Sequence, residues 1–265
     1  MPLTEAIGEA TINGLAYVGA LARITGGAVR AAFSGPPRAR TQRWRRAVHQ
    51  AMSAGVEALP VVSLISFFVG MIVALQGAYQ LRKLGAMQLV AAAVALIITR
   101  ELGPLMTAVM VIGRSGSAFA AEIGTMKVDE ELDALETMAL EPVPFLVAPK
   151  FLAMILMMPC LTTWADFMGV VGGGVFGVAK AGFTWGTYFH ATLDALVQRD
   201  IITGLIKSLM FGIVITAVGC QEGFSTGLGP EEVGRSTTSA VVKSIFLVIA
   251  VDLIFTAIFY FTAPQ

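Results

Sequence analysis

Residues 100–142 read RELGPLMTAVMVIGRSGSAFAAEIGTMKVDEELDALETMALEP, and this stretch decides the fold. Its first half is an apolar run that contains the adjacent charged residues Arg100 and Glu101. Charge at the depth of the hydrocarbon is costly, so we expect the pair to serve a binding site or a contact between helices rather than to face lipid. The second half predicts a short, acidic, amphipathic helix in the cytosol. The sequence therefore predicts a polar site inside a membrane span, followed within a few helical turns by a cytosolic acidic helix.

The acidic helix is predicted within residues 122–141, a segment with seven acidic residues and one lysine. Its apolar positions recur every three or four residues and acidic residues fill most places between them, which gives a one-sided stripe suited to a groove on another protein. We expect that groove to be basic. The residues expected to make the contact are Val128, Glu131, Leu132, Asp133, Leu135 and Ala139.

The composition of the whole chain indicates an all-α integral membrane protein. Hydrophobic residues make up 56% of the sequence and charged residues 14%, against roughly 25% charged in soluble domains. Runs long enough to cross about 30 Å of hydrocarbon predict five transmembrane helices. They lie near residues 58–80, 86–113, 146–178, 201–221 and 240–262. Pro149 and Pro159 interrupt the third run, so its start is left open as a turn at the membrane surface.

The amino-terminal segment is basic, and the rest of the chain forms the five-span domain. Residues 1–50 carry arginines typical of cytoplasmic segments, which places the amino terminus inside and, with five spans, the carboxy terminus outside. They lack the early apolar core and the cleavage site of a signal peptide, so we expect them to stay attached. Weak amphipathicity over residues 5–33 favours an interfacial helix in the headgroup layer, with an ordinary cytosolic tail as the alternative. The two domains are thus residues 1–50 and 51–265.

The charges inside the spans allow two interpretations. Adjacent residues of a helix point about 100° apart, so Arg100 and Glu101 cannot simply neutralise each other and at least one needs a partner elsewhere. The pair either lines a site for the headgroup of an amphiphilic substrate or forms a structural ion pair between helices. Asp166, Lys207 and Asp252 lie one in each of the last three spans. We interpret them as structural charges facing other helices, with a proton relay as the alternative.

Several classes of function lack support in the sequence. The glycine-rich segment 223–234, GFSTGLGPEEVG, lacks the Gly-Lys-Ser/Thr ending of a nucleotide loop and is predicted to be a flexible cytosolic loop. No arrangement of nucleophile and base stands out, so the chain is not expected to be an enzyme. Cys160 and Cys220 are interpreted as small core residues, and His49 and His190 lack the spacing of metal ligands. No metal site and no nucleic-acid partner are expected.

Four motifs between residues 100 and 142 resemble the signature of the MlaE (YrbE-type) permease family, membrane subunits of ABC transporters associated with MCE proteins. The motifs are Arg100-Glu101-Leu102-Gly103-Pro104, Gly113-Arg114-Ser115-Gly116, Ala121-Glu122-Ile123-Gly124 with Met126, and Glu131-Leu132-Asp133-Ala134 before Pro142. Their order and spacing are highly specific. Weaker similarity extends from about Gly55 to Phe261, and the first 50 residues match only in being basic and amphipathic.

The resemblance implies the permease of an ATP-driven transporter that moves phospholipids between the inner and outer membranes of a bacterium. It implies a homodimer in the inner membrane, a cytosolic ABC ATPase that holds ATP and Mg and contacts the acidic helix as a coupling helix, and a periplasmic ring of MCE proteins. A small cytosolic accessory subunit is left open. No cofactor is implied on this chain. The implied lipid pocket at the dimer interface is lined by Leu75, Gln76, Tyr79, Arg100 and Glu101.

Two other functions remain open from the sequence. An ion- or proton-coupled carrier would use the carboxyl groups of Glu101, Asp166 and Asp252. A membrane anchor for the MCE assembly would transport nothing. The coupling helix favours the ATP-driven permease, because a secondary carrier needs no docking helix for an ATPase.

Overall fold

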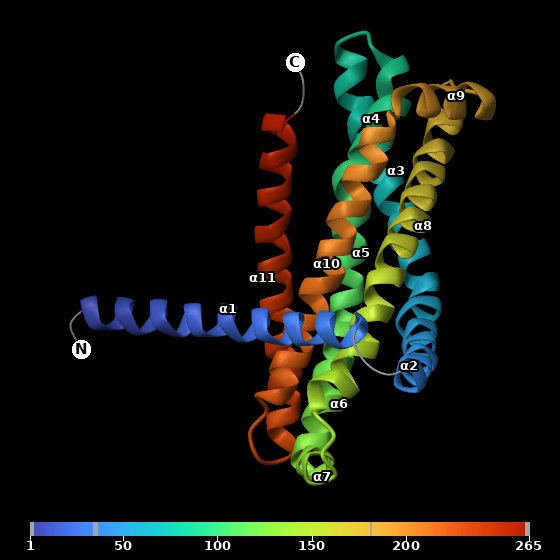
Figure 1. Ribbon diagram of the computed structural model, residues 1–265. Helices are drawn as coiled ribbons and strands as arrows, with labels where there is room; N and C mark the ends of the chain where they lie inside the picture. The colour runs from blue at the N-terminus through green and yellow to red at the C-terminus, as the bar shows by residue number, and fades with distance from the viewer. Residues whose placement is uncertain (1–2, 34–36, 181, 263–265) are drawn as a thin grey trace. The chain divides into compact units, whose positions relative to one another are not determined.

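The computed structural model describes residues 3–33, 37–180 and 182–262, and every regular element within these ranges is a helix (Figure 1). The predicted all-α membrane fold is confirmed. Five helical stretches are long and apolar enough to span a membrane. They are Trp44–Lys83, Met87–Val128, Val143–Lys180, Gln198–Phe224 and Pro230–Thr262.

The elements follow one another with short connections. The α-helices are α1 (Leu3–Phe33), α2 (Pro37–Gly55), α3 (Leu59–Lys83), α4 (Val90–Ile97), α5 (Gly103–Val111), α6 (Ser117–Val128), α7 (Glu131–Thr137), α8 (Ala148–Lys180), α9 (Trp185–Ala195), α10 (Gln198–Phe224) and α11 (Pro230–Thr262). Two 3₁₀ turns, η1 (Val56–Ala58) and η2 (Met87–Leu89), and three π-helical turns, η3 (Ile98–Leu102), η4 (Ile112–Gly116) and η5 (Val143–Val147), join neighbouring helices.

Two helical stretches extend beyond the predicted spans. The stretch that contains the second span continues past residue 113 through η4 and α6 to Val128. The stretch that contains the third span begins at Val143, in the π-helical turn η5 that leads into α8. Pro149 is the second residue of α8, which directly follows η5, and Pro159 lies within α8.

Two smaller expectations also change. The glycine-rich segment 223–234 is mostly helical, because α10 continues to Phe224 and α11 begins at Pro230. Only the residues between them form the loop. Cys160 is exposed and therefore no core residue, whereas Cys220 is buried as expected.

The chain divides into two compact units, each with its own packing. Unit 1 comprises Met1–Ala51, Ser115–Met154 and Ile213–Ser244. Unit 2 comprises Met52–Arg114, Ile155–Gly212 and Ile245–Gln265.

Unit 2 is held together by close backbone packing between α3 and α8. A Cβ on Gly70 would lie 1.8 Å from the carbonyl oxygen of Gly169, and one on Gly172 would lie 2.0 Å from that of Phe67. No side chain fits these positions, so the glycines let the two helices touch. At the end of α8, α9 packs on α4 through Tyr188, which donates a hydrogen bond of 3.1 Å to the carbonyl of Val170. Burial raises the pKa of Tyr188 to about 12.

Unit 1 joins α1 to α10 and α11 through one carboxylate. Glu222 accepts hydrogen bonds from the Tyr17 hydroxyl at 2.9 Å, the Ser239 hydroxyl at 2.6 Å and the Lys243 ammonium at 2.7 and 2.8 Å. The helix predicted over residues 5–33 is present as α1 and is bonded to the bundle. Its place at a membrane surface stays a prediction.

Candidate functional site

The site is built on the π-helical turn η3 inside the second span. Pro104 has no N–H, so the carbonyl four residues before it receives no helical bond, and the helix widens there. Accordingly the Gly103 N–H donates to the carbonyl of Ile98, five residues back. The widened turn contains Arg100 and Glu101. It sets the directions in which these two side chains leave the helix.

Arg100 pairs with the start of α10. Its Nε and Nη2 atoms lie 2.6 and 2.5 Å from Asp200 Oδ1. The other carboxyl oxygen of Asp200 accepts the Val197 N–H at 3.1 Å, which satisfies a donor at the amino end of that helix. The carboxylate is buried, whereas 53% of the Arg100 side chain is exposed. The buried Asp200 carboxylate therefore holds Arg100 in place, while about half of the arginine side chain stays accessible.

Glu101 pairs with a buried lysine in the middle of α10. Lys207 Nζ lies 2.5 Å from Glu101 Oε2 and 2.7 Å from the Thr256 hydroxyl, and it forms an ion pair of 3.0 Å with Asp252. The lysine side chain is fully buried. Thr256 in turn donates to the Glu101 carboxylate at 3.3 to 3.4 Å. One ammonium thus holds two acids from two other helices.

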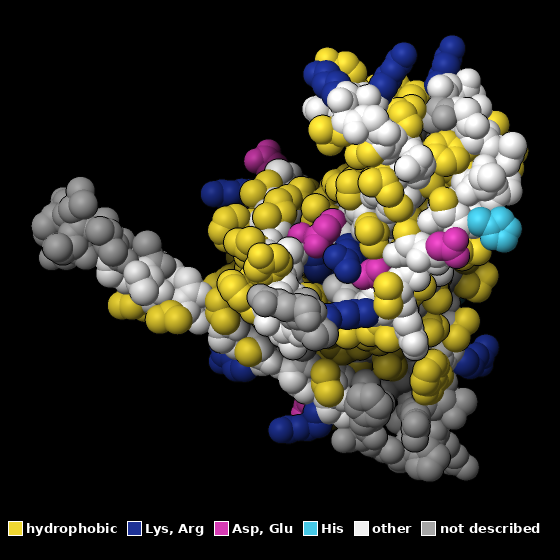
Figure 2. All heavy atoms as spheres, turned by 90° about the horizontal axis from the view of Figure 1, so that it is seen from above, with side chains coloured by type: hydrophobic (Ala, Val, Ile, Leu, Met, Phe, Trp, Pro, Cys, Tyr) yellow, Lys and Arg dark blue, Asp and Glu magenta, His cyan; other side chains and the backbone are white. Residues whose placement is uncertain are grey.

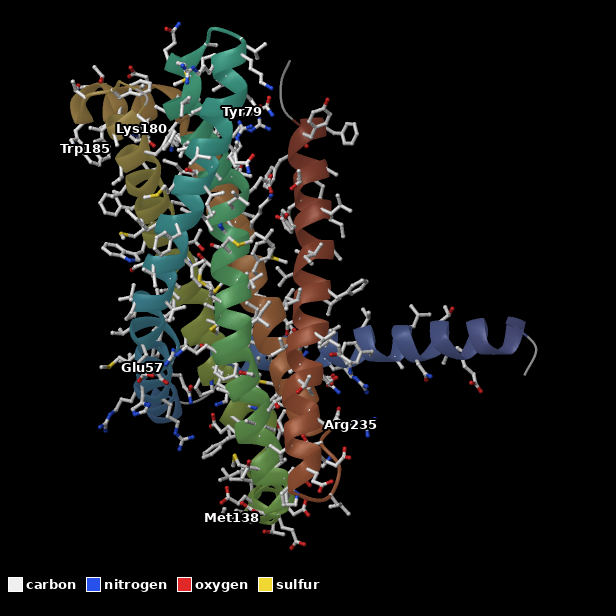
Figure 3. All side chains as sticks on the ribbon, turned by 180° about the vertical axis from the view of Figure 1, so that it is seen from behind. Glu57, Tyr79, Met138, Lys180, Trp185 and Arg235 are labelled. Carbon is white, nitrogen blue, oxygen red and sulfur yellow. The ribbon has the colours of Figure 1, made fainter. Side chains whose placement is uncertain are left out.

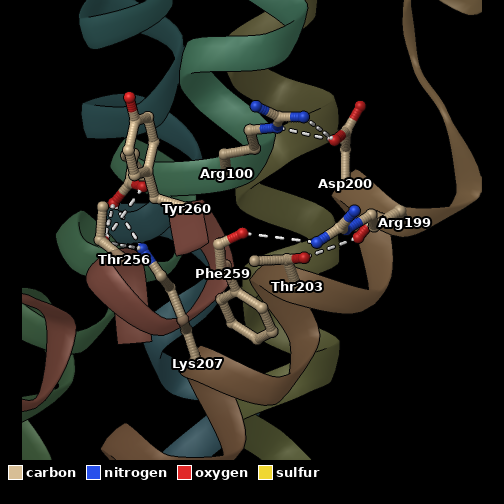
Figure 4. A pocket seen from close by; sticks show the side chains of 9 residues that line it. Arg100, Arg199, Asp200, Thr203, Lys207, Thr256, Phe259 and Tyr260 are labelled. Atoms are coloured by element: carbon tan, nitrogen blue, oxygen red, sulfur yellow. Dashed lines mark hydrogen bonds and ion pairs between the residues drawn. The ribbon is translucent and has the colours of Figure 1, made fainter. Parts of the chain in front are cut away.

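These charged groups line a cavity of about 210 Å³ in unit 2 (Figure 4). Three cationic and two acidic side chains face it, together with a threonine pair and two aromatic rings. In the view of Figure 2, basic and acidic side chains gather in a hollow surrounded by apolar ones. The lining residues are Arg100, Glu101, Arg199, Asp200, Thr203, Lys207, Thr256, Phe259 and Tyr260. The cavity offers both signs of charge within an apolar bundle.

A comparison with known protein families identifies the chain. The model of the family described as permease MlaE matches residues 47–258. This chain belongs to the MlaE permease family. The permease is therefore a multi-pass membrane transporter component rather than an enzyme, and the motif resemblance found in its sequence is confirmed.

Relatives of the permease have consistent names. A probable ABC transporter permease of Rickettsia bellii is 41% identical over 213 residues, which are 80% of this chain and 82% of the relative. A probable ABC transporter permease of Synechocystis is 38% identical over 204 residues, 77% of this chain and 78% of the relative. The intermembrane phospholipid transport system permease protein MlaE of Haemophilus influenzae is 35% identical over 214 residues, with 80% and 82% covered.

The predicted pocket residues of the permease fall into two groups. Arg100 and Glu101 line the cavity, and both have a partner on another helix, where the sequence predicted a partner for at least one. Leu75, Gln76 and Tyr79 do not line it and lie on the exposed face of α3, where Lys83 Nζ sits 4.4 Å from the Tyr79 ring centre (Figure 3). The structure of one chain does not bring the two groups into one pocket.

The exposed face of α3 is a continuous apolar row. Its members are spaced by three or four residues and are between 49% and 62% exposed. They are Val61, Leu64, Phe68, Ile72, Leu75 and Tyr79. Leu75 and Tyr79 thus belong to a surface that lipid or another protein must cover in a membrane.

The predicted coupling helix is shorter than expected. Glu130 adopts φ 59°, a left-handed conformation that separates α6 from the seven-residue α7. Val128 therefore ends the preceding helix, and Ala139, also left-handed at φ 57°, lies beyond α7. Leu132 and Leu135 are buried.

The free face of α7 is acidic. Three of its five exposed residues are the acids Glu131, Asp133 and Glu136, and Met138 is exposed just past the end of the helix (Figure 3). Because the leucines pack inward, the acidic residues rather than the apolar stripe are available to a partner.

Sequence reasoning missed Arg199 and Asp200 as site residues. They form a second adjacent pair of opposite charges, at the start of the fourth span, and that repetition of the Arg100-Glu101 pattern was the available signal. Lys207 and Asp252 were interpreted as structural charges facing other helices, and the structure pairs Lys207 with both Glu101 and Asp252. Asp166 packs against Gly103, where a Cβ would lie 1.7 Å from its Oδ1 atom. Within the described ranges no three metal-ligating side chains come together.

Proposed function

We propose that the permease is the membrane subunit of an ATP-driven transporter of phospholipids between the inner and outer membranes of a bacterium. The observation that carries this proposal is the charged cavity around Arg100. A phospholipid headgroup bears a phosphate and often an ammonium group, and the cavity presents cationic and acidic side chains to each. The name of the Haemophilus relative, an intermembrane phospholipid transport permease, supports the same substrate class.

The exposed guanidinium of Arg100 is the proposed contact for the phosphate. Asp200 holds one edge of that group, and the half-exposed side chain leaves the rest accessible from the cavity. Arg199, whose Nη2 donates to the Phe259 carbonyl at 3.4 Å, is a second cation on the same wall. Guanidinium groups pair with phosphate through two parallel hydrogen bonds, which would orient the headgroup.

The size of the cavity supports a homodimer. Sites for drug-sized ligands occupy roughly 300–1,000 Å³, and about 210 Å³ holds a headgroup but not two acyl chains. The acyl chains of the lipid need an apolar surface outside the cavity. The exposed row on α3, with Leu75 and Tyr79, is the proposed wall, completed by the same row of a second copy. Gln76, exposed beside them, would contact the glycerol region.

The energy source is proposed to be a cytosolic ABC ATPase that binds ATP and Mg. The permease sequence contains no nucleotide-binding loop. The acidic face of α7 is the proposed docking surface for a basic groove on that ATPase. The permease would lie in the inner membrane with its amino terminus in the cytoplasm and its carboxy terminus in the periplasm, beneath a ring of MCE proteins.

A transport assay tests the headgroup site. Arg199→Gln in proteoliposomes with the ATPase should reduce phospholipid affinity by about tenfold or more, because one charge-assisted hydrogen bond is worth about 1.5–3 kcal/mol. Arg235→Gln is the matched control, since its side chain is 82% exposed and lies outside the cavity. Equal transport by both variants at limiting lipid, with intact assembly, would remove the cavity from the transport path.

A binding assay tests the docking surface. Asp133→Lys together with Glu136→Lys reverses the charge of the exposed face of α7 without touching its buried leucines. Copurification of the ATPase should be lost, whereas Asp194→Lys, at an exposed acid on α9, should leave it intact. Full ATPase binding by the α7 variant would contradict the proposed contact.

The carrier alternative keeps one supporting observation. Asp166 Oδ1 is buried without a hydrogen-bond partner, as is Asp252 Oδ1, although Asp252 forms an ion pair with Lys207. Transport that persists without the ATPase and stops in Asp166→Asn would favour a proton-coupled carrier over the ATP-driven permease.

A further inference from the structure

Unit 1 contains a second cavity, of about 230 Å³, that shares no residue with the cavity around Arg100. It is formed by the middle of α2, by α6, by η5 and by the first turn of α8. Two cations, a histidine and one acid line it together with three apolar side chains. The lining residues are Arg46, His49, Gln50, Glu122, Phe145, Leu146, Pro149 and Lys150.

The basic side of this cavity is built from two differently held cations. The guanidinium carbon of Arg46 lies 4.0 Å from the centre of the Phe145 ring, a cation–π contact. Lys150 is only 1% exposed. Its Nζ lies 2.5 Å from Glu122 Oε2 and 5.0 Å from the Phe119 ring centre. An ammonium has three donors, and the Glu122 contact uses one of them.

The charge of the lining favours an anionic ligand. Glu122 balances Lys150, which leaves the positive charge of Arg46 without an acidic counterpart among the lining residues. His49 and Gln50, one turn further along α2, add hydrogen-bonding groups beside it. A phosphate oxygen is the ligand that such a combination of guanidinium, imidazole and amide groups matches.

The remaining lining indicates that the phosphate belongs to a lipid. Phe145, Leu146 and Pro149 give the cavity an apolar wall, which suits the glycerol and first acyl carbons of an amphiphile. The outer face of α2 carries an exposed apolar row, Trp44, Val48 and Met52, four residues apart. A tryptophan next to arginines at the end of a span is typical of the headgroup layer.

We propose that this cavity binds the phosphate of an anionic phospholipid of the surrounding bilayer. Arg46, His49 and Gln50 contact the phosphate, and the apolar wall contacts the glycerol region. The bound lipid ties α2 to the start of the third span. It is a resident lipid with a structural role, so the proposal does not depend on what the permease transports.

Native mass spectrometry of the full-length permease in detergent tests this site. Titration with phosphatidylglycerol and with phosphatidylcholine of the same acyl chains compares an anionic with a zwitterionic headgroup. We expect the wild type to bind at least one phosphatidylglycerol molecule, with an affinity about tenfold higher than its affinity for phosphatidylcholine. Arg46→Gln should weaken that binding by about tenfold, the value of one charge-assisted hydrogen bond.

The neighbouring Arg45 supplies the matched control. It is exposed on the same helix and does not line the cavity, so Arg45→Gln should change the affinity by less than about twofold. If both variants lose the same amount of phosphatidylglycerol affinity, the effect comes from general surface charge and the proposal is overturned. If Arg46→Gln does not fold, Gln50→Ala removes one neutral contact instead, with an expected loss of about fivefold.

Inorganic phosphate separates a lipid from a soluble anion. A rise in the unfolding temperature of the delipidated permease with phosphate, combined with no preference for phosphatidylglycerol over phosphatidylcholine, would assign the cavity to a soluble anion and overturn the lipid. A phosphatidylglycerol preference that depends on Arg46 supports the proposal.

Discussion

Arg100 and Glu101 are adjacent in sequence, yet their two salt bridges are opposite in burial. In the first, the acid Asp200 is buried and the cation Arg100 is half exposed. In the second, the cation Lys207 is fully buried and the acid Glu101 is 38% exposed. The buried members both belong to α10, seven residues apart, and the exposed members both belong to the π-helical turn.

The difference in burial indicates how much stability is lost when either member of a pair is mutated. A buried charge that loses its partner keeps the cost of burial unless another polar group or water reaches it, whereas an exposed charge is hydrated at once. α10 therefore supplies the fixed charges, and the turn at η3 supplies the accessible ones. A ligand that binds an exposed group takes it away from its buried partner. The buried partner then needs another hydrogen bond, and the Val197 N–H provides one for Asp200.

The largest effect should come from exchanging the adjacent charges. Arg100→Glu with Glu101→Arg places an acid beside Asp200 and a cation beside Lys207, so it breaks both pairs and should cost more than about 5 kcal/mol. The reciprocal exchange Arg100→Asp with Asp200→Arg keeps opposite charges together and should be more stable than Arg100→Asp alone. The measurement is the unfolding temperature of each variant in detergent, compared among the two exchanges and Arg100→Asp alone. Equal stability of the two exchanges would mean that the pairing of opposite charges does not determine stability here.

Removing the buried cation should be the next most damaging change. Lys207→Met leaves Glu101 and Asp252 without their ammonium, at a cost of about 3–5 kcal/mol. Adding Glu101→Gln and Asp252→Asn should recover part of the loss. Lys180→Met, at an exposed lysine, serves as the control in the same thermal unfolding measurement. A wild-type unfolding temperature for Lys207→Met would show that the triad contributes nothing to stability.

Removing the exposed cation should cost less. Arg100→Ala takes two charge-assisted bonds from Asp200, which keeps the Val197 N–H and gains access to water, so about 1–2 kcal/mol is expected. A double-mutant cycle with Asp200→Asn measures the coupling. If Arg100→Ala destabilises more than Lys207→Met does, the Val197 N–H and water do not compensate Asp200 for the lost guanidinium.

The smallest effect should come from the hydroxyl that bridges the second pair. Thr256→Val removes one acceptor from Lys207 and one donor from Glu101, while both carboxylates stay on the ammonium, so about 0.5–1.5 kcal/mol is expected. Thr262→Val is the control, because that hydroxyl bonds only to the Ile258 carbonyl of its own helix. A loss as large as that of Lys207→Met would mean that Thr256, not the acids, anchors the lysine.

The sequence predicted the helical membrane fold, because five long apolar runs allow little else in a bilayer. It also predicted that Arg100 or Glu101 needs a partner on another helix, since this follows from helix geometry alone. It could not name Asp200 and Lys207, because the register between two packed helices depends on contacts between residues about 100 positions apart. Helix packing, rather than local propensity, decides that register.

The acidic segment shows the limit of periodicity. The spacing of Leu132 and Leu135 predicted a one-sided helix, and α7 has that face. Periodicity does not say whether an apolar face meets another protein or the chain's own interior. The left-handed Glu130 was also not predictable from composition, because glycine or asparagine is the usual residue there.

The π-helical turn η3 also changes how the second span must be mapped. Such a turn accommodates one residue more than an α-helix, so the side chains after Leu102 are rotated by about 100° relative to those before Ile98. A helical wheel drawn through α4 and α5 as one regular helix therefore assigns half of its positions to the wrong side. Cysteine crosslinking or spin labels placed along this span need separate wheels for Val90–Ile97 and Gly103–Val111.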